Sequence, residues 1–281
     1  LRTYRLFEEK LMGRPNLVYR QVQAGTNACF SIHTLDKVWA DEYAALQDIP
    51  MIDTVMLRTP MILHPKSSKR TGMFTEIDTQ PMTYFNKGES NWFCYPCKVG
   101  ALLCFVYFNS KYMSSALSMA NLFELATKEE SAQKPDLVVI FGNDDGNDDT
   151  NFYYDEANDI WVGCISDNPR IEYFGYLKKM CLTLHNLAQM KKGWLPIHGA
   201  FVNIYLKDGT KKGIMLMGDS GAGKSESIEA LKAAAGDMIR EVEVVFDDMG
   251  TIHLEDGVPY GQGTEIGAFI RLDDLDPGTP Y

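Results

Sequence analysis

The sequence predicts an α/β protein of two domains. Apolar runs bounded by turn residues alternate with segments of helical periodicity along the 281-residue chain, and a glycine-rich loop lies between a strand-like and a helix-like run. At roughly 150 residues per domain, this length corresponds to about two domains. The first part of the chain mixes helix-like and strand-like patterns, whereas the later part shows a strand–helix–strand pattern. We therefore expect an N-terminal α/β domain over residues 1–165 and a second domain over residues 166–281.

Composition excludes several classes of protein. The chain carries 27 Lys and Arg against 38 Asp and Glu, so its net charge of −11 repels phosphate backbones and we expect no nucleic-acid partner. The longest apolar run, residues 99–108, is about half of what a membrane-spanning helix requires, so we expect no membrane segment. Six scattered cysteines and the lack of an opening signal peptide predict reduced thiols in a cytoplasmic protein. The oligomeric state stays open.

In the first domain, apolar and β-branched runs alternate with helical periodicity. The acidic stretch 143–151 predicts a solvated turn. The other expected elements are amphipathic helices at residues 37–47 and 111–129, buried strands at 101–108 and 137–141, and a hairpin of strands 152–154 and 160–164.

In the second domain, strands and helices surround the glycine-rich loop. Apolar residues recur at helical spacing over residues 173–190 and predict a helix there. The strand–helix–strand order over residues 213–246 is a βαβ pattern. The individual elements expected are strands at 200–206, 213–217, 242–246 and 251–254, and a helix at 226–235.

The glycine-rich loop, GDSGAGKS, matches the phosphate-loop pattern GxxxxGK[ST] in full. Glycines let successive backbone N–H groups turn inward toward phosphate oxygens, and the helix that follows adds the positive end of its dipole. In this pattern Lys224 reaches the β- and γ-phosphates, and the Ser225 hydroxyl binds Mg²⁺. The alternative is a chance glycine-rich turn. The predicted nucleotide-binding residues are Gly218, Asp219, Ser220, Gly221, Ala222, Gly223, Lys224, Ser225 and Glu226.

Two acidic residues follow the strand predicted at 242–246. Asp247 and Asp248 stand where a phosphate-loop fold places its metal-binding carboxylate, at the C-terminal end of a strand. The alternative is a solvated turn, because Asp pairs are common in turns.

Lys178, Lys179 and His198 are the remaining candidates for chemistry. The lysines lie early in the predicted helix, where the macrodipole opposes a cation and favours the neutral amine that a metal ligand or a base needs. From position alone a solvated lysine pair is the better interpretation, and a lone histidine before a strand is more often structural. The order of lysine pair, histidine, phosphate loop and aspartate pair favours the chemical interpretation.

That order resembles the phosphoenolpyruvate carboxykinase family. Residues 173–179, YFGYLKK, fit its Tyr-x-Gly-x-x-Lys-Lys pattern, and His198 follows Lys179 at the 19-residue interval expected of that family. The resemblance covers about residues 170–250. It implies an enzyme that decarboxylates oxaloacetate and phosphorylates the resulting enolate from ATP, with Mn²⁺ and Mg²⁺, to give phosphoenolpyruvate.

The resemblance also implies roles for single residues. Lys179, His198 and Asp248 would hold Mn²⁺, and Ser225 would hold Mg²⁺ with the nucleotide. Tyr173 and Lys178 would face the carboxylate substrate, for which Arg58 and Arg70 are candidate arginines. The catalytic set implied in this way is Lys178, Lys179, His198, Lys224, Asp247 and Asp248, with Asp247 as a further metal candidate.

Two strings depart from the ATP-dependent carboxykinases. The chain has GDSGAGKSES where they read Gly-x-Ser-Gly-Thr-Gly-Lys-Thr-Thr, and His-Gly-Ala-Phe-Val where they read His-Cys-Ser-Ala-Asn. Both strings resemble HPr kinase/phosphorylase, a relative that lacks the upstream Tyr-x-Gly-x-x-Lys-Lys element. A kinase that acts on a protein hydroxyl is therefore the second hypothesis, and a non-catalytic nucleotide-binding regulatory domain is the third.

The fold class implied is α/β, with the N-terminal α/β domain followed by a P-loop phosphoenolpyruvate carboxykinase/HPr kinase-like mixed-sheet domain. The chain begins at Leu1, and 33 residues follow Asp248, whereas the resemblance implies a further lobe there. We therefore expect a second domain that is incomplete at its C-terminus, and a piece that holds phosphate and metal ligands without turning over by itself.

Cys94 and Cys97 form a CxxC sequence that no second CxxC or His pair completes as a zinc site. We expect packed or incidental thiols, with redox or metal chemistry as the alternative. Residues 261–265 are interpreted either as a plain turn or as a loop over the site.

Overall fold

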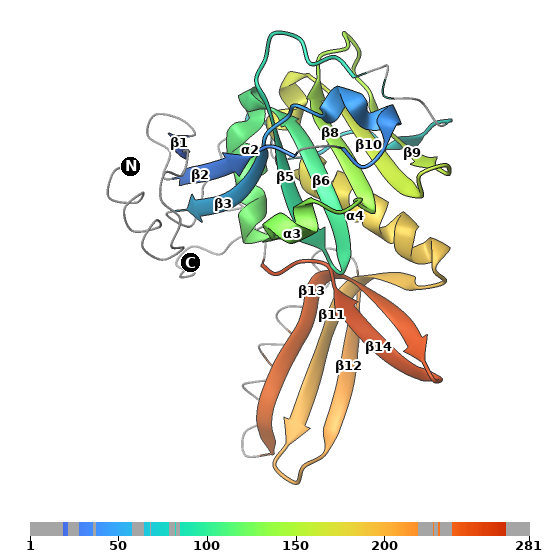
Figure 1. The fold of residues 1–281 in the computed structure, drawn as a ribbon. Coiled ribbons are helices and arrows are strands. Elements are labelled where there is room, and N and C mark those ends of the chain that lie inside the picture. Colours follow the sequence, from blue (N-terminus) through green and yellow to red (C-terminus); the bar gives the residue numbers. More distant parts are fainter. Residues whose placement is uncertain are drawn as a thin grey trace. The chain divides into compact units, whose positions relative to one another are not determined.

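The computed structural model describes residues 19–21, 28–35, 38–57, 65–67, 69–78, 82, 85–218, 227, 230 and 238–267. These residues fall into two compact units, one up to Leu184 and the other from His185 onward (Figure 1). The sequence suggests a domain boundary near residue 165, whereas the two units divide inside helix α4 (Gly175–Lys191).

The described part of the first unit contains one sheet of ten strands (Figure 1). These are β1 (Tyr19–Gln21), β2 (Ala28–His33), β3 (Met51–Leu57), β4 (Thr75–Glu76), β5 (Trp92–Val99), β6 (Leu102–Asn109), β7 (Glu124–Leu125), β8 (Leu137–Asn143), β9 (Thr150–Asp155) and β10 (Ile160–Ser166). They adjoin in the order β1–β2–β3–β5–β6–β8–β10–β9–β4, and β7 pairs with β5. The central strands β6, β8 and β10 run parallel, whereas β5 pairs antiparallel with β6 and β9 with β10, so the sheet is mixed.

Helical segments of the first unit are short apart from α4. They are η1 (Asp41–Leu46), η3 (Ser110–Tyr112), α2 (Met113–Ser118), η4 (Met119–Asn121), α3 (Lys128–Ser131) and η5 (Pro169–Glu172). Among the described residues, no helix is long and apolar enough to cross a membrane.

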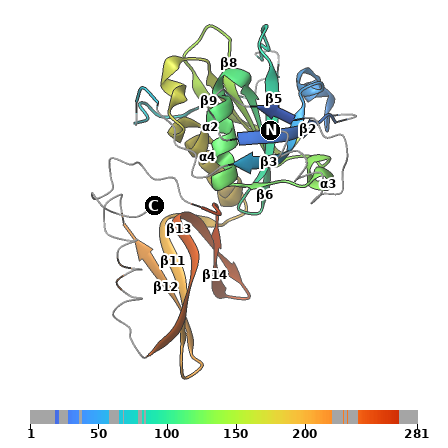
Figure 2. The ribbon, with the colours of Figure 1, turned by 90° about the vertical axis from the view of Figure 1, so that its left-hand side faces the viewer.

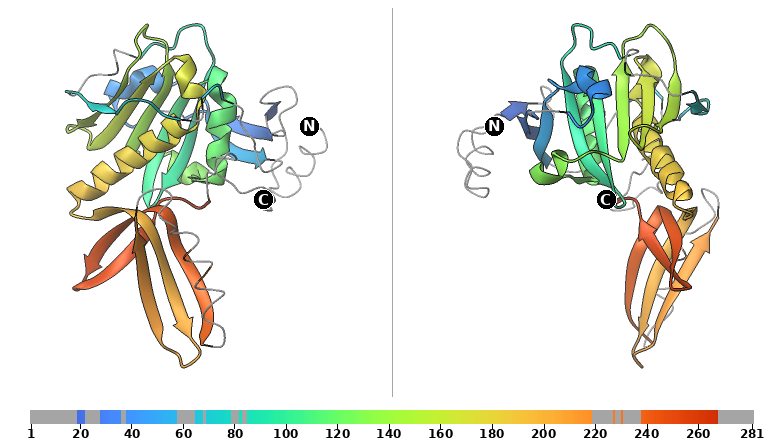
Figure 3. Two further views of the ribbon diagram at one scale, coloured as in Figure 1. Left: turned by 180° about the vertical axis from the view of Figure 1, so that it is seen from behind. Right: turned by 45° about the vertical axis from the view of Figure 1, so that its right-hand side comes forward.

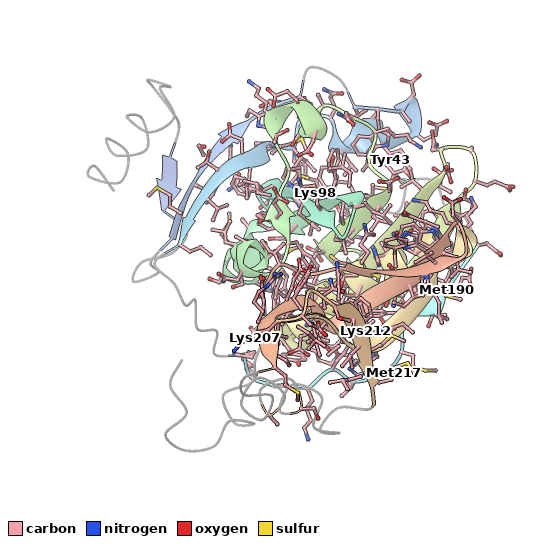
Figure 4. All side chains as sticks on the ribbon, turned by 90° about the horizontal axis from the view of Figure 1, so that it is seen from below. Tyr43, Lys98, Met190, Lys207, Lys212 and Met217 are labelled. Atoms are coloured by element: carbon pink, nitrogen blue, oxygen red, sulfur yellow. The ribbon has the colours of Figure 1, made fainter. Side chains whose placement is uncertain are left out.

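The two faces of the sheet are covered by different helices. On one face lies η1, whose Tyr43 packs in a cluster with Phe105 and Val138 and donates a hydrogen bond to Asp155 (Figure 4). On the opposite face lie α2 and α4 (Figure 3). There Gly163 of β10 makes room for α4, because a Cβ at that position would meet the Met180 side chain at 2.5 Å. The sheet is therefore the middle layer of this unit.

Burial on both faces explains the unbroken apolar run of β8. Val138 and Ile140 belong to the cluster under η1, whereas the alternate residue Phe141 contacts the ring of Tyr112, on the side of α2. All residues of β8 are buried. A central strand of parallel neighbours has no solvent face, so its sequence shows no polar alternation.

The second unit contains a four-stranded sheet in its described part (Figure 2). Its strands are β11 (Leu195–Leu206), β12 (Lys211–Met217), β13 (Ile239–Glu255) and β14 (Val258–Gly263). The order is β12–β11–β13–β14, and the three pairings described are all antiparallel, not mixed as expected. β12 and β13 therefore run in the same direction on either side of β11.

Most elements predicted from the sequence are confirmed within a few residues, although the short helix at 37–47 is only the six-residue η1. Of the helix predicted at 226–235, the structure describes only residues 227 and 230. The confirmed elements are the strands at 101–108, 137–141, 152–154, 160–164, 200–206 and 213–217, and the helix at 173–190.

The helix predicted at residues 111–129 is wrong as one element. The chain makes η3, α2 and η4, and then leaves the helix to form β7 against β5. Thr127 starts the separate helix α3, because its side chain accepts from Glu130 N while the Glu130 carboxylate accepts from Thr127 N, a capping box. Pairing with a distant strand therefore interrupts a segment whose local pattern favours helix.

The two strands predicted at 242–246 and 251–254 are one strand, β13. Asp247 and Asp248 consequently lie inside a strand and not in a turn at its end. The reason is the length of β11, which offers pairing partners to β13 from Leu195 to Leu206, past the acidic pair. Residues 258–263 likewise form β14, so the turn or loop expected at 261–265 is wrong for its first three residues.

Gly142 offers a test of the packing of the first unit. Its φ is +84°, and a Cβ there would meet the Tyr112 ring at 2.7 Å. Gly142→Ala should lower the free energy of unfolding by about 3 kcal/mol, from left-handed strain and overpacking together. Gly146→Ala is the control, because its φ is +74° with nothing within 4 Å. That variant should cost only about 1 kcal/mol; equal losses in urea denaturation would contradict the packing argument.

Candidate functional site

Three strands of the second unit bring separate stretches of sequence together at one place. Gly199 of β11 pairs with Met217, the last residue of β12, on one side and with Asp248 of β13 on the other. Met217, labelled in Figure 4, is directly followed in the sequence by Gly218, the first residue of the phosphate-loop motif. The register of the sheet therefore places the start of that motif beside His198 and the acidic pair.

His198 and Asp248 are in direct contact. The distance from His198 Nε2 to Asp248 Oδ1 is 3.1 Å, and their side chains are 43% and 39% exposed. The pair is therefore accessible to solvent and to a ligand. Asp248 has a φ of +94°, a conformation that is unusual for a residue with a side chain. Such backbone strain persists where the surrounding structure enforces it, and it clusters at functional sites.

Asp247 pairs with Ala200 of β11 and is exposed. The phosphate-loop residues beyond Gly218 lie outside the described residues. These are Asp219, Ser220, Gly221, Ala222, Gly223, Lys224, Ser225 and Glu226.

Gly199 is required by the close approach of β12. A Cβ at this position would lie 2.6 Å from the backbone oxygen of Leu216, a distance that real Cβ atoms do not tolerate. A larger residue after His198 would therefore move the backbone of one of the two strands. The His-Gly dipeptide is a structural consequence of how tightly β11 and β12 meet beside the candidate site.

Glu265 is the last residue of the segment 261–265, which the sequence offered either as a plain turn or as a loop over the site, and β14 brings it toward Asp248. The β13–β14 pairing ends at Gly250 opposite Gly263, and Thr264 continues it by donating from its N and Oγ1 to Met249 O. One more residue in the same register would put Glu265 opposite Asp248. Both of its carboxylate oxygens are buried. No motif marks it in the sequence; only the pairing of β14 with β13 shows it.

The remaining candidates lie in the first unit, at the start of α4. Tyr173 precedes the helix, and its ring lies across Gly175, where a Cβ would meet ring carbons at 2.3 and 2.6 Å and the hydroxyl oxygen at 2.9 Å. The glycine of the Tyr-x-Gly element is therefore needed to seat the tyrosine. Lys178 is only 5% exposed, whereas Lys179 is half-buried. The interpretation as a solvated lysine pair is therefore wrong for Lys178, whose side chain is buried.

Of the two arginines proposed to bind the substrate carboxylate, the structure describes Arg70. Arg58 lies outside the described residues. Arg70 is exposed; its Nη1 donates to Gly72 O at 2.6 Å, and its guanidinium lies 4.7 Å from the centroid of the Phe74 ring. These two contacts fix the orientation of the guanidinium within its own loop.

The donors at His198 and Asp248 can be tested for their fit to a metal. Among the described residues, no group of three or more His, Cys, Asp or Glu side chains is arranged to hold a metal ion. Imidazole and carboxylate are both ligands that Mn²⁺ accepts. Adjacent donors of an octahedral ion with ligand distances of about 2.1 Å lie about 3 Å apart. The 3.1 Å separation fits two neighbouring positions of one such ion, which would need its other ligands elsewhere.

The comparisons with known proteins add no family. The sequence matches no protein-family model, and it matches no curated protein.

The CxxC cysteines do not form a site. Cys94 and Cys97 are three residues apart on β5, so their side chains leave opposite faces of the sheet. Cys94 belongs to the cluster under η1, whereas Cys97 lies near Cys104 and Cys181, and all four are fully buried. The expectation of packed thiols is confirmed.

The thiols of Cys94 and Cys97 should be inert in the folded protein. Burial raises the pKa of both, which lowers the fraction of reactive thiolate at pH 8. Alkylation of these two residues by iodoacetamide, followed by mass spectrometry, should be about 100-fold slower in buffer than in urea, if opening costs about 3 kcal/mol. Formation of a Cys94–Cys97 disulfide in the native protein with diamide would contradict the assignment.

Proposed function

We propose that the protein binds ATP and divalent metal ions and transfers the γ-phosphoryl group in a reaction like that of the phosphoenolpyruvate carboxykinases. The observation that carries this proposal is the His198–Asp248 contact beside Met217, which pairs with Gly199 and directly precedes the phosphate-loop motif. A metal-binding pair beside a phosphate loop is the arrangement that phosphoryl transfer from a nucleotide requires.

The proposed reaction converts oxaloacetate and ATP into phosphoenolpyruvate, CO₂ and ADP. Decarboxylation leaves an enolate, whose oxygen attacks the γ-phosphorus while ADP leaves. Lys224 and the loop N–H groups would hold the phosphates, and Ser225 would bind Mg²⁺. His198, Asp248 and Lys179 would hold Mn²⁺, which supplies Lewis-acid stabilisation of the negative charge that develops.

Features of α4 support a carboxylate substrate. Lys178 is almost wholly buried in the first turn, and Tyr173 is seated by Gly175 directly before that turn. The positive end of a helix dipole favours an anion. Because the Tyr-x-Gly-x-x-Lys-Lys element is missing from the HPr kinase pattern, its presence at this helix start favours the carboxykinase-like reaction.

A second candidate is a kinase that phosphorylates a protein hydroxyl, as HPr kinase does. The observation in its favour is Gly199, since the 2.6 Å approach of Leu216 O leaves no room for the Cys that follows the histidine in ATP-dependent carboxykinases. In this reaction His198 with Asp247 or Asp248 would serve metal and base roles, and the lysine pair would be incidental.

The metal pair is tested by Asp248→Asn in the full-length protein. Removal of a ligand should weaken Mn²⁺ binding about 10–100-fold, at least as much as loss of an outer partner does. Electron paramagnetic resonance titration of free Mn²⁺ measures this. The matched control is Glu255→Gln, which alters the other described His–carboxylate contact of this sheet, His253 to Glu255 at 2.9 Å. Unchanged Mn²⁺ affinity in Asp248→Asn would refute the proposed site.

Lys179→Ala separates the two candidate functions. In a carboxykinase-like enzyme it should lower Mn²⁺ affinity about tenfold or more, and with it the formation of phosphoenolpyruvate from oxaloacetate and ATP. Lys192→Ala, just beyond the end of α4, should change neither quantity. Phosphorylation of a protein substrate that survives Lys179→Ala would support the kinase instead. Nucleotide binding without turnover of any substrate would favour a regulatory domain.

A further inference from the structure

Tyr176 lies in the first turn of α4, at a variable position of the Tyr-x-Gly-x-x-Lys-Lys element, so the resemblance gives it no role. Its side chain is 1% exposed. A buried phenol hydroxyl is unfavourable unless it finds a hydrogen-bond partner. The partner is Thr71, which lies 105 residues earlier in the chain.

One hydroxyl binds both main-chain groups of Thr71. Tyr176 Oη accepts from Thr71 N at 3.0 Å and donates to Thr71 O at 3.2 Å, and Thr71 Oγ1 lies 3.2 Å away. Thr71 itself is exposed. The backbone of a surface loop is therefore fastened to a buried side chain of α4.

The fastened loop, Lys69 to Phe74, carries two exposed cations, Lys69 and Arg70. The Arg70 guanidinium is oriented inside the loop by Gly72 O and the Phe74 ring. At its far end the loop is held where Thr150 Oγ1 donates to Met73 O at 3.3 Å. The position of Arg70, the residue before Thr71, thus depends on the hydrogen bonds of Tyr176.

We propose that Tyr176 is a positioning residue, which holds the Lys69–Phe74 loop on the first turn of α4 so that Arg70 meets a carboxylate of a small dicarboxylate substrate. This inference rests on the proposed function, in which Tyr173 and Lys178 face the same substrate. An acidic protein needs locally concentrated positive charge to bind a dianion, and a guanidinium held in a fixed orientation binds carboxylate in a two-point geometry.

The kinetic test is Tyr176→Phe, which keeps the ring and removes the hydroxyl. Loss of hydrogen bonds that position a charged group should raise KM for oxaloacetate about tenfold, with kcat and the Kd of ATP within about twofold of wild type. Tyr95→Phe is the matched control, because Tyr95 is also fully buried and donates to a main-chain oxygen, Phe123 O, at 3.1 Å. It should leave KM unchanged. A loss of kcat alone, or equal KM values for the two variants, would overturn the proposal.

Limited proteolysis tests the same inference without catalysis. Trypsin cleaves after Lys69 and Arg70, and a fastened loop must open before it is cut. Cleavage there should be about tenfold faster in Tyr176→Phe than in wild type or Tyr95→Phe, which corresponds to the loss of about 1.4 kcal/mol of docking energy. Oxaloacetate should slow cleavage of wild type and not of Arg70→Gln.

The kinetic and proteolysis experiments together distinguish failure of this inference from failure of the proposed function. If wild type does not turn over oxaloacetate with ATP, the proposed function fails, and protection of the loop by oxaloacetate still decides the role of Tyr176. Protection that is lost in Tyr176→Phe supports the proposal. Cleavage rates that are identical in wild type and Tyr176→Phe, or an Arg70→Gln loop that oxaloacetate protects normally, overturn it.

Discussion

The candidate site of the second unit depends on one interaction, the antiparallel pairing of β11 with β13. This pairing runs from Leu195 to Leu206 and fixes which residues stand side by side. Its register is set by apolar side chains, since Ala200, Val202 and Ile204 alternate along β11 and form the buried cluster of this sheet. A slip of one residue would turn all three toward solvent. The contact of His198 with Asp248 is therefore a consequence of where the core residues lie.

Sequence patterns predicted correctly those helices and strands whose own apolar residues follow the spacing of their buried faces. The buried strand at 137–141 and the helix at 173–190 carry apolar residues at the spacing that their final contacts demand. The predictions were wrong where pairing with a strand distant in the sequence determines the secondary structure. Residues 124–125 leave a helical pattern to pair with β5, and Asp247 and Asp248 stay in a strand because β11 extends past them. No local propensity encodes the length of another strand.

The same limit applies to the residues of the site. His198, Asp247 and Asp248 could be named from their order along the chain, and the register of the sheet brings the first and last of them together. Glu265 could be named only as part of the segment 261–265, because its position next to Thr264, which bonds to Met249 O, exists only once β14 has folded against β13. The role of Tyr176 could not be predicted for a similar reason. A buried tyrosine is expected on any helix that packs on a core, and its hydrogen bonds join residues 105 positions apart in the sequence.

Features that cost stability gather at the same places as the candidate chemistry. Asp248 adopts a φ of +94°, and Lys178 is buried to 95% in the first turn of a helix whose dipole opposes a cation. Two glycines nearby, Gly175 and Gly199, are required by a tyrosine ring and a main-chain oxygen, so substitution there would displace Tyr173 or β11. Asp159 and Asp256 also have positive φ values, of 52° and 50°, but both lie in turns, where Asp tolerates this conformation. Departures from local preferences in backbone conformation and burial are typical of positions shaped by binding and catalysis.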